Sequence, residues 1–147
     1  MPQSWNAAAL IKEINPSEAW ELLNEDSRAV LLDVRSRVEF EYVGHPPGAI
    51  NIPWKDAPGW EIDTEFVDKV RAALEKLFPQ ANRVEDLTIL SLCRSGARSR
   101  TAGEALQKDG FARVYNVAEG FEGDRDEHRH RNTLNGWRVR NLPWEQS

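Results

Sequence analysis

The residues best suited to chemistry are Cys93 and the short polar stretch that follows it. Cys93 is the only cysteine in the chain, which excludes an internal disulfide and a multi-cysteine metal site. A lone cysteine is either a small buried hydrophobe or a reactive thiol. Its neighbours favour the reactive thiol, because they are small, polar or basic. They are Arg94, Ser95, Gly96, Ala97, Arg98 and Ser99.

The position of this loop strengthens the case for a site. It lies between an apolar run at 87–92 and a helical pattern at 97–108, which places it at the carboxyl end of a strand, where open α/β sheets bind ligands. Inward-pointing backbone N–H groups, a helix N-terminus and the charges of Arg94 and Arg98 all favour the thiolate. Gly96 permits the tight curl. The alternative is an inert buried Cys93 beside two surface arginines, and the small polar loop disfavours it.

The rest of the chain alternates between strand and helix patterns. Apolar runs predict strands at residues 29–34, 49–53, 87–92 and 114–117. Helical patterns begin after Asn15, a predicted N-cap, and recur at 36–42, 63–77 and 97–108. This alternation predicts an α/β domain with a mainly parallel central sheet and helices on both faces. From Gly120 onward the chain is polar and irregular, and Trp137 and Trp144 are expected to anchor it as a tail.

Length and charge limit the classes of function. The 147 residues suit one domain, 1–147, with a core at about 15–123 and a C-terminal extension at 124–147. A net charge of -5 argues against nucleic-acid binding. No apolar run approaches the ~20 residues that span a bilayer, and Met1 to Leu10 lacks the features of a signal peptide. We expect a cytoplasmic protein with no nucleic-acid or membrane partner.

Several phrases of the sequence, in their order, resemble the rhodanese-like domain family of single-domain sulfurtransferases. The resemblance runs from about Asn15 to Gly123 and includes the Cys93 loop. The other phrases are Leu32-Asp33-Val34-Arg35, Gly44-His45-Pro46-Pro47-Gly48-Ala49-Ile50-Asn51-Ile52-Pro53, Gly110-Phe111 and Val114-Tyr115-Asn116-Val117-Ala118-Glu119-Gly120. The resemblance implies that Asp33 and Arg35 form supporting polar links near the loop, and that His45 packs in its turn rather than acting as a base.

The length of the loop separates two chemistries within this broader fold. The family's sulfurtransferases use a loop of six residues, and Cys93 to Arg98 has that length. Related phosphatases place their arginine one position later, where this chain has Ser99. The shorter loop fits a single sulfane sulfur on Cys93, so phosphatase or arsenate-reductase-like chemistry is disfavoured.

The resemblance implies sulfur transfer by double displacement. Cys93 would take sulfane sulfur from a small anionic donor such as thiosulfate, hold it as a persulfide, and pass it to cyanide or a thiol. Arg94 and Arg98 would steer the anionic donor. No metal or organic cofactor is expected, since His128 and His130 stand in a charged run without the spacing of a metal site. Two alternatives remain open: a persulfide relay with a partner protein as donor or acceptor, and a regulatory binding module.

Overall fold

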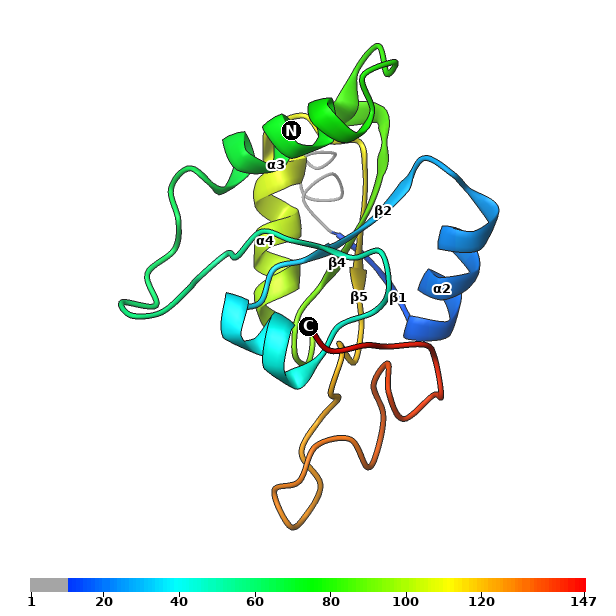
Figure 1. Ribbon diagram of the computed structural model, residues 1–147, viewed down its shortest axis with the longest axis vertical. Helices are drawn as coiled ribbons and strands as arrows, with labels where there is room; N and C mark the ends of the chain where they lie inside the picture. The colour runs from blue at the N-terminus through cyan, green and yellow to red at the C-terminus, as the bar shows by residue number, and fades with distance from the viewer. Residues whose placement is uncertain (1–10) are drawn as a thin grey trace, which may run out of the picture.

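The computed structural model describes residues 11–147, which form a parallel sheet with helices on both faces (Figure 1). The strands are β1 (Lys12–Ile14), β2 (Ala29–Asp33), β3 (Ile50–Asn51), β4 (Thr88–Leu92) and β5 (Arg113–Val117). They lie in the order β1-β5-β4-β2-β3, and every pairing is parallel. The predicted α/β fold is therefore confirmed. The expectation about a signal peptide concerns Met1 to Leu10, which lie outside the described residues.

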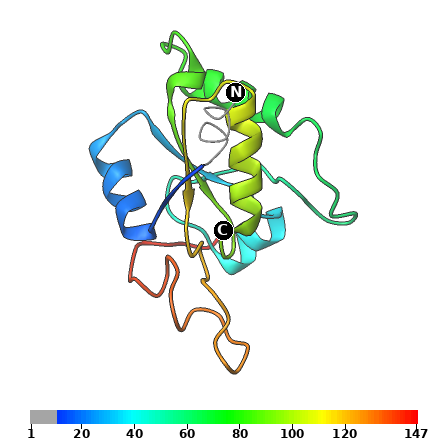
Figure 2. The same cartoon turned by 180° about the vertical axis from the view of Figure 1, so that it is seen from behind.

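Apolar side chains cover both faces of the sheet. On one face, α3 (Phe66–Leu77) and α4 (Ala97–Lys108) bury Phe66, Val70, Leu74, Ala102 and Leu106. On the other face, α2 (Pro16–Glu25) and the C-terminal tail bury Ala19, Phe121 and Trp137. Figure 2 shows α2 and α4 on opposite sides of the strands. The central strand β4 is buried along its whole length, which explains why its sequence is a nearly continuous apolar run.

The start of α2 follows from its sequence. The Asn15 side chain accepts a hydrogen bond from the Glu18 backbone N–H at 2.8 Å, and the Glu18 carboxylate accepts one from the Asn15 N–H at 2.8 Å. These reciprocal bonds satisfy two N–H groups that the first helical turn leaves free. Pro16 has no N–H to satisfy, so it suits the first helical position. The predicted cap at Asn15 is confirmed.

Some predicted boundaries differ from the structure. Helix α3 begins at Phe66 rather than near residue 63, because Asp63 forms a turn in which its carboxylate accepts from the Glu65 N–H at 2.9 Å. The helical segment predicted at 36–42 overlaps the π-helix η1 (Glu39–Val43), and a 3-10 turn, η2 (Val84–Asp86), precedes β4. Strand β1 was not predicted, because a three-residue segment of Lys, Glu and Ile carries no periodic pattern. No helix within residues 11–147 is both long and apolar enough to cross a bilayer.

The C-terminal tail lies beyond the carboxyl ends of the strands (Figure 1, orange to red). It is held by Trp137, which is fully buried, packs edge-on against Trp20, and donates from Nε1 to the Pro143 carbonyl at 2.8 Å. Trp144 is 43% exposed and contacts the edge of the Phe121 ring. At its end, the Ser147 N–H donates to the Glu41 carbonyl of η1. A few buried aromatic rings therefore order this tail without strands or α-helices.

Candidate functional site: the Cys93 loop

Cys93 lies at the carboxyl end of β4, directly before the loop that leads into α4. Its side chain is 1% exposed. The sulfur accepts a hydrogen bond from the Gly96 backbone N–H at 3.1 Å and lies 3.2 Å from the Ser99 Oγ in the first turn of α4. The structure therefore brings Cys93, Gly96 and Ser99 together, and the Gly96 N–H points at the sulfur.

Gly96 is required by the backbone conformation of the loop. It caps α4 with φ +115° and ψ -12°, a left-handed region that other residues avoid. The space around it is not the constraint, because a Cβ placed there would meet only ordinary contacts of 3.8 Å. The curl predicted from the sequence thus depends on the freedom of glycine to take a positive φ.

The outer side of the loop is held by the start of the tail. The Phe121 N–H donates to the Cys93 carbonyl at 2.8 Å, and the Glu122 N–H donates to the Arg94 carbonyl at 2.9 Å. Gly120 is so close that a Cβ there would lie 2.5 Å from the Arg94 carbonyl carbon and oxygen. The fully buried Phe121 ring lies under the guanidinium of Arg35, 4.6 Å from its centre. The start of the tail therefore fixes the backbone of the loop on its outer side.

Asp33 and Arg35 form a buried ion pair at the carboxyl end of β2, next to β4. Their side chains are fully buried, and Nη2 of Arg35 lies 2.6 Å from Oδ2 of Asp33. The same Nη2 donates to the Gly44 carbonyl at 2.7 Å. Arg35 also contacts the Phe121 ring of the tail. The pair therefore ties β2 to the turn at Gly44 and to the tail.

The His45 ring also makes packing contacts. Its ring stacks on Phe40 with the centroids 3.8 Å apart, and its Nδ1 lies 2.8 Å from the Phe40 carbonyl. Its Nε2 lies 3.4 Å from the Glu145 carboxylate of the tail. Both ring nitrogens are thus directed to partners other than Cys93, as the family resemblance implied.

The structure changes the role expected for Arg98. Its guanidinium forms two hydrogen bonds to the Glu39 carboxylate, Nη1 to Oε1 and Nη2 to Oε2, each 2.8 Å long. Burial alone would raise the pKa of Glu39, but the hydrogen bonds and charge of Arg98, with further bonds from Ser36, lower that pKa to about 2. Glu39 therefore stays ionised and neutralises Arg98. An arginine bound in this way is poorly suited to steer an anionic donor.

Arg94 is the loop arginine that stays exposed. Among residues 11–147, no ion pair involves Arg94. A hollow of ≈ 760 Å³ opens beside it between Ser95 and the tail segment 124–131, and Arg125, Arg129 and Arg131 line it. Burial, and then the charges of Arg94 and Arg125, lower the pKa of Arg131. The same hollow contains Asp124, Asp126 and Glu127, so its charge is mixed.

Two polar residues behind the loop were not singled out from the sequence. The fully buried Asn116 on β5 donates from Nδ2 to the Gly96 carbonyl at 3.1 Å and to the Glu13 carboxylate on β1 at 2.9 Å. Its Oδ1 lies 2.5 Å from the Ser99 Oγ. The available signal for Asn116 was an amide within an otherwise apolar strand. Glu13 carried no signal, because its strand was not predicted.

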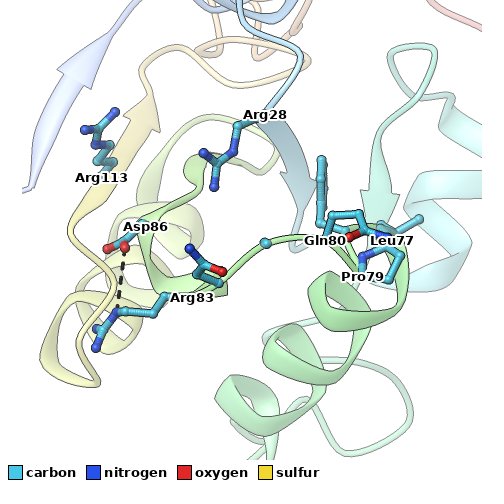
Figure 3. A pocket seen from close by; sticks show the side chains of 10 residues that line it. Arg28, Leu77, Pro79, Gln80, Arg83, Asp86 and Arg113 are labelled. Atoms are coloured by element: carbon cyan, nitrogen blue, oxygen red, sulfur yellow. Dashed lines mark ion pairs between the residues drawn. The ribbon is translucent and has the colours of Figure 1, made fainter.

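A second hollow lies at the opposite edge of the sheet, near the amino ends of the strands. Figure 3 shows the side chains that line it. Its volume is ≈ 700 Å³, and Arg28, Arg83 and Arg113 line it near the amino ends of β2, β4 and β5. Arg83 forms a 3.6 Å ion pair with Asp86, and both side chains are largely exposed. This hollow holds neither the cysteine nor the carboxyl ends of strands, so we assign the functional site to the Cys93 edge.

Comparison with known proteins agrees with this geometry. Residues 15–127 match the family model described as Rhodanese-like domain. The chain is 33% identical over 112 residues to a protein named thiosulfate sulfurtransferase GlpE from Glaesserella parasuis, a match that covers 76% of this chain and 83% of the relative. It is 30% identical over 138 residues to the RP600 homolog of Rickettsia rickettsii, covering 92% and 98% of the two chains.

Solved structures show the same fold. The crystal structure of Rv0390 from M. tuberculosis superimposes with a TM-score of 0.78 at 33% sequence identity. The match covers 94% of this chain and 99% of that one. The likeness therefore extends beyond the sheet and into the C-terminal tail.

Proposed function

Because the chain belongs to the rhodanese-like domain family, we propose that it is a sulfurtransferase that carries sulfane sulfur as a persulfide on Cys93. The observation that supports this most directly is the sulfur environment. Cys93 is buried at the end of β4, and its Sγ meets the Gly96 N–H and the Ser99 Oγ. The Gly96 N–H is fixed in place before the reaction, so it can stabilise negative charge on sulfur without reorganising.

The proposed cycle has two displacements. The Cys93 thiolate attacks the outer sulfur of thiosulfate, a new S–S bond forms, and the S–S bond of thiosulfate breaks with its electron pair leaving on sulfite. The charge stays on the outer sulfur of the persulfide. A second nucleophile, cyanide or a thiolate, then attacks that outer sulfur, and the electron pair of the persulfide bond returns to Cys93. The first step exchanges one S–S bond for another, and the second exchanges the S–S bond of the persulfide for an S–C bond to cyanide or an S–S bond to the thiolate, so no external oxidant or reductant is needed.

The donor would approach past Arg94. Arg98 is neutralised by Glu39, whereas Arg94 is exposed beside the hollow lined by Ser95 and the tail arginines. In a chain of net charge -5, a local cation is needed to attract a dianion such as thiosulfate. The carboxylates of the hollow are partly occupied, since Asp126 accepts from the backbone N–H groups of His128 and His130. We therefore assign the steering role to Arg94.

The decisive experiment measures the intact mass of the purified protein after incubation with thiosulfate and removal of excess donor. We expect one added sulfur, lost again on addition of cyanide with release of thiocyanate. The matched control is Cys93→Ser, which keeps the size of the side chain but cannot form a persulfide. Absence of added sulfur from thiosulfate and from a low-molecular-weight persulfide would contradict the proposal.

The relay function predicts a different pattern in the same assay. A relay module would accept sulfur readily from a persulfide donor but only slowly from thiosulfate. Its Cys93 would still gain one sulfur. Comparing the two loading rates on one protein sample therefore separates an enzyme that uses small anions from a relay between partner proteins.

A further inference from the structure

The Ser99 hydroxyl has two neighbours that compete for its single proton. Its Oγ lies 2.5 Å from the Asn116 Oδ1 and 3.2 Å from the Cys93 Sγ. A hydroxyl carries one proton, so it can donate to only one of them at a time. All three residues are buried, so bulk water has little access to replace a missing hydrogen bond. The direction of this proton therefore matters for the charge on the sulfur.

The contacts of Asn116 decide where the proton lies. Its Nδ2 faces two groups that only accept, the Gly96 carbonyl at 3.1 Å and the Glu13 carboxylate at 2.9 Å. This fixes the orientation of the amide, so its oxygen faces Ser99. An amide oxygen cannot donate, and the Ser99 proton must lie on this side for the 2.5 Å contact to be a hydrogen bond. The lone pairs of Ser99 then face Cys93.

This arrangement fits a thiol and conflicts with a thiolate. A thiol S–H can donate to the Ser99 Oγ, whereas a thiolate would face lone pairs at 3.2 Å. We propose that the Ser99 hydroxyl turns from Asn116 to Cys93 whenever the thiolate forms, and that Asn116 is a positioning residue that sets the balance between these two states. The proposal deepens the sulfur-transfer function above and rests on it for its place in the cycle.

In that cycle the turn would occur when the acceptor removes the outer sulfur. The S–S bond of the persulfide breaks and its electron pair stays on Sγ, where the Ser99 proton can form a charge-assisted hydrogen bond. When Sγ bonds to the next sulfur, it loses this charge and the hydroxyl returns to the Asn116 Oδ1. The proton stays covalently bound to Ser99 throughout. Asn116 thereby acts on Cys93 only through Ser99.

Glu13 would tune this balance. Its carboxylate binds the Asn116 Nδ2, and an amide that donates to an anion becomes a stronger acceptor at its oxygen. Glu13 also accepts from Arg100 Nε at 2.8 Å. Apart from the exposed Arg94, the charged groups around Cys93 are paired with one another, as Arg98 with Glu39, Arg100 with Glu13, and Asp33 with Arg35. Their direct field on the sulfur does not depend on the direction of the Ser99 proton.

A double-mutant cycle tests the proposal. The rate of Cys93 alkylation by neutral iodoacetamide is measured against pH for the wild type, Ser99→Ala, Asn116→Leu and the double variant. Ser99→Ala should raise the midpoint pH by about one unit, because the thiolate loses a donor. Asn116→Leu should lower it by roughly half to one unit, because the hydroxyl is released toward the sulfur. The double variant should match Ser99→Ala within error.

Two results would overturn the proposal. In the first, Asn116→Leu shifts the midpoint pH of alkylation as much in the Ser99→Ala background as in the wild type. This would mean that Asn116 acts through the loop backbone. The other is a higher midpoint in Asn116→Leu, which would mean that Asn116 directs the hydroxyl onto the sulfur. Arg113→Leu, on the same strand at the opposite edge, is the matched control and should leave the midpoint unchanged.

A milder variant keeps the test decisive if Asn116→Leu does not fold. Glu13→Gln retains an acceptor for the Asn116 Nδ2 but removes the negative charge. It should therefore lower the midpoint pH of alkylation more in the wild-type background than in the Ser99→Ala background. Equal shifts would indicate only a direct field effect and would reject the proposal. Alkylation does not require sulfur transfer, so failure of the proposed function, seen by mass, stays distinguishable from failure of this inference.

Discussion

The two edges of the sheet both carry arginines and a hollow, yet they differ in how their polar groups are held. At the carboxyl edge, Arg35 and Arg98 are buried or half-buried and bonded to carboxylates. At the amino edge, Arg28, Arg83 and Arg113 line an open hollow, and the Arg83 pair with Asp86 is largely exposed (Figure 3). Charge and concavity are thus common to both edges, and at the carboxyl edge the arginines Arg35 and Arg98 are held by carboxylates near Cys93.

The difference has a physical cause. Parallel strands end with their loops and the following helix N-terminus at the carboxyl edge, and there the Gly96 N–H points at the Cys93 sulfur. The tail then closes this edge, and with less water each hydrogen bond is stronger. At the amino edge, the Arg83–Asp86 pair is largely exposed among residues 11–147, so its charges are solvated and screened. The predictions below test this contrast, from the largest effect to the smallest.

The largest effect is expected from Gly120→Ala. An alanine there would have to adopt the positive φ of +67°, and its Cβ would lie 2.5 Å from the Arg94 backbone. We expect a loss of about 3 kcal/mol or more in the free energy of unfolding, from backbone strain and overpacking together. Urea unfolding monitored by tryptophan fluorescence measures it.

The matched control at the amino edge is Gly110→Ala. Gly110 also has a positive φ, +102°, but a Cβ there would meet nothing within 4 Å. Gly110→Ala should therefore lower the free energy of unfolding only by the conformational strain, about 1–2 kcal/mol. Equal losses at the two glycines would show that the close packing of tail on loop contributes nothing.

The next effect concerns Glu39→Gln. The pKa of Glu39, about 2 in the folded protein, lies below its unfolded value, so the ionised carboxylate stabilises the fold by roughly 2–3 kcal/mol at neutral pH. This contribution is complete above the unfolded pKa and is lost as the pH falls through the folded pKa. The stability difference between wild type and Glu39→Gln should therefore shrink by about half near pH 3.

The same measurement at the other edge provides the comparison. Arg83→Ala breaks an exposed pair and should cost less than ~0.5 kcal/mol at any pH. Chemical denaturation at several pH values measures the free energy of unfolding of both variants. A Glu39→Gln difference that stays constant between pH 7 and pH 3 would contradict the buried ion pair.

A smaller effect is expected from Arg94→Ala on catalysis. Loss of the exposed cation should lower kcat/KM for thiosulfate by about five- to tenfold at low salt, and the loss should diminish at high salt because ions screen the attraction. Alkylation of Cys93 by neutral iodoacetamide should change much less. If both reagents slow equally, Arg94 acts on the thiolate itself and the steering role is wrong.

The smallest effect is expected from Arg28→Ala and Arg113→Ala at the amino edge. Each should change the free energy of unfolding by less than ~0.5 kcal/mol and leave sulfur transfer unchanged, since exposed side chains away from the site contribute little. A clear loss of transfer in either variant would show that the hollow in Figure 3 takes part in function.

Local signals in the sequence predicted much of the fold. The Asn15 cap, the apolar runs of β2 and β4, and the helix α4 at Ala97–Lys108 were all readable, because each depends on residues close together in the chain. The same was true of Cys93 and the glycine in its loop, since a strand followed by a curl and a helix is a local arrangement. The sequence by itself determined where Cys93 would lie.

Only the tertiary structure decided the partners of these groups. Glu39 meets Arg98 across 59 positions, and Glu13 meets Asn116 across 103. Such pairs leave no periodic pattern, because they form only when η1, β1 and β5 are packed against the loop. The ordered conformation of the tail likewise depends on the burial of Phe121 and Trp137, since the polar sequence of the tail favours neither helix nor strand. The position of Cys93 is thus set by short-range chain geometry, and its charge environment by long-range packing.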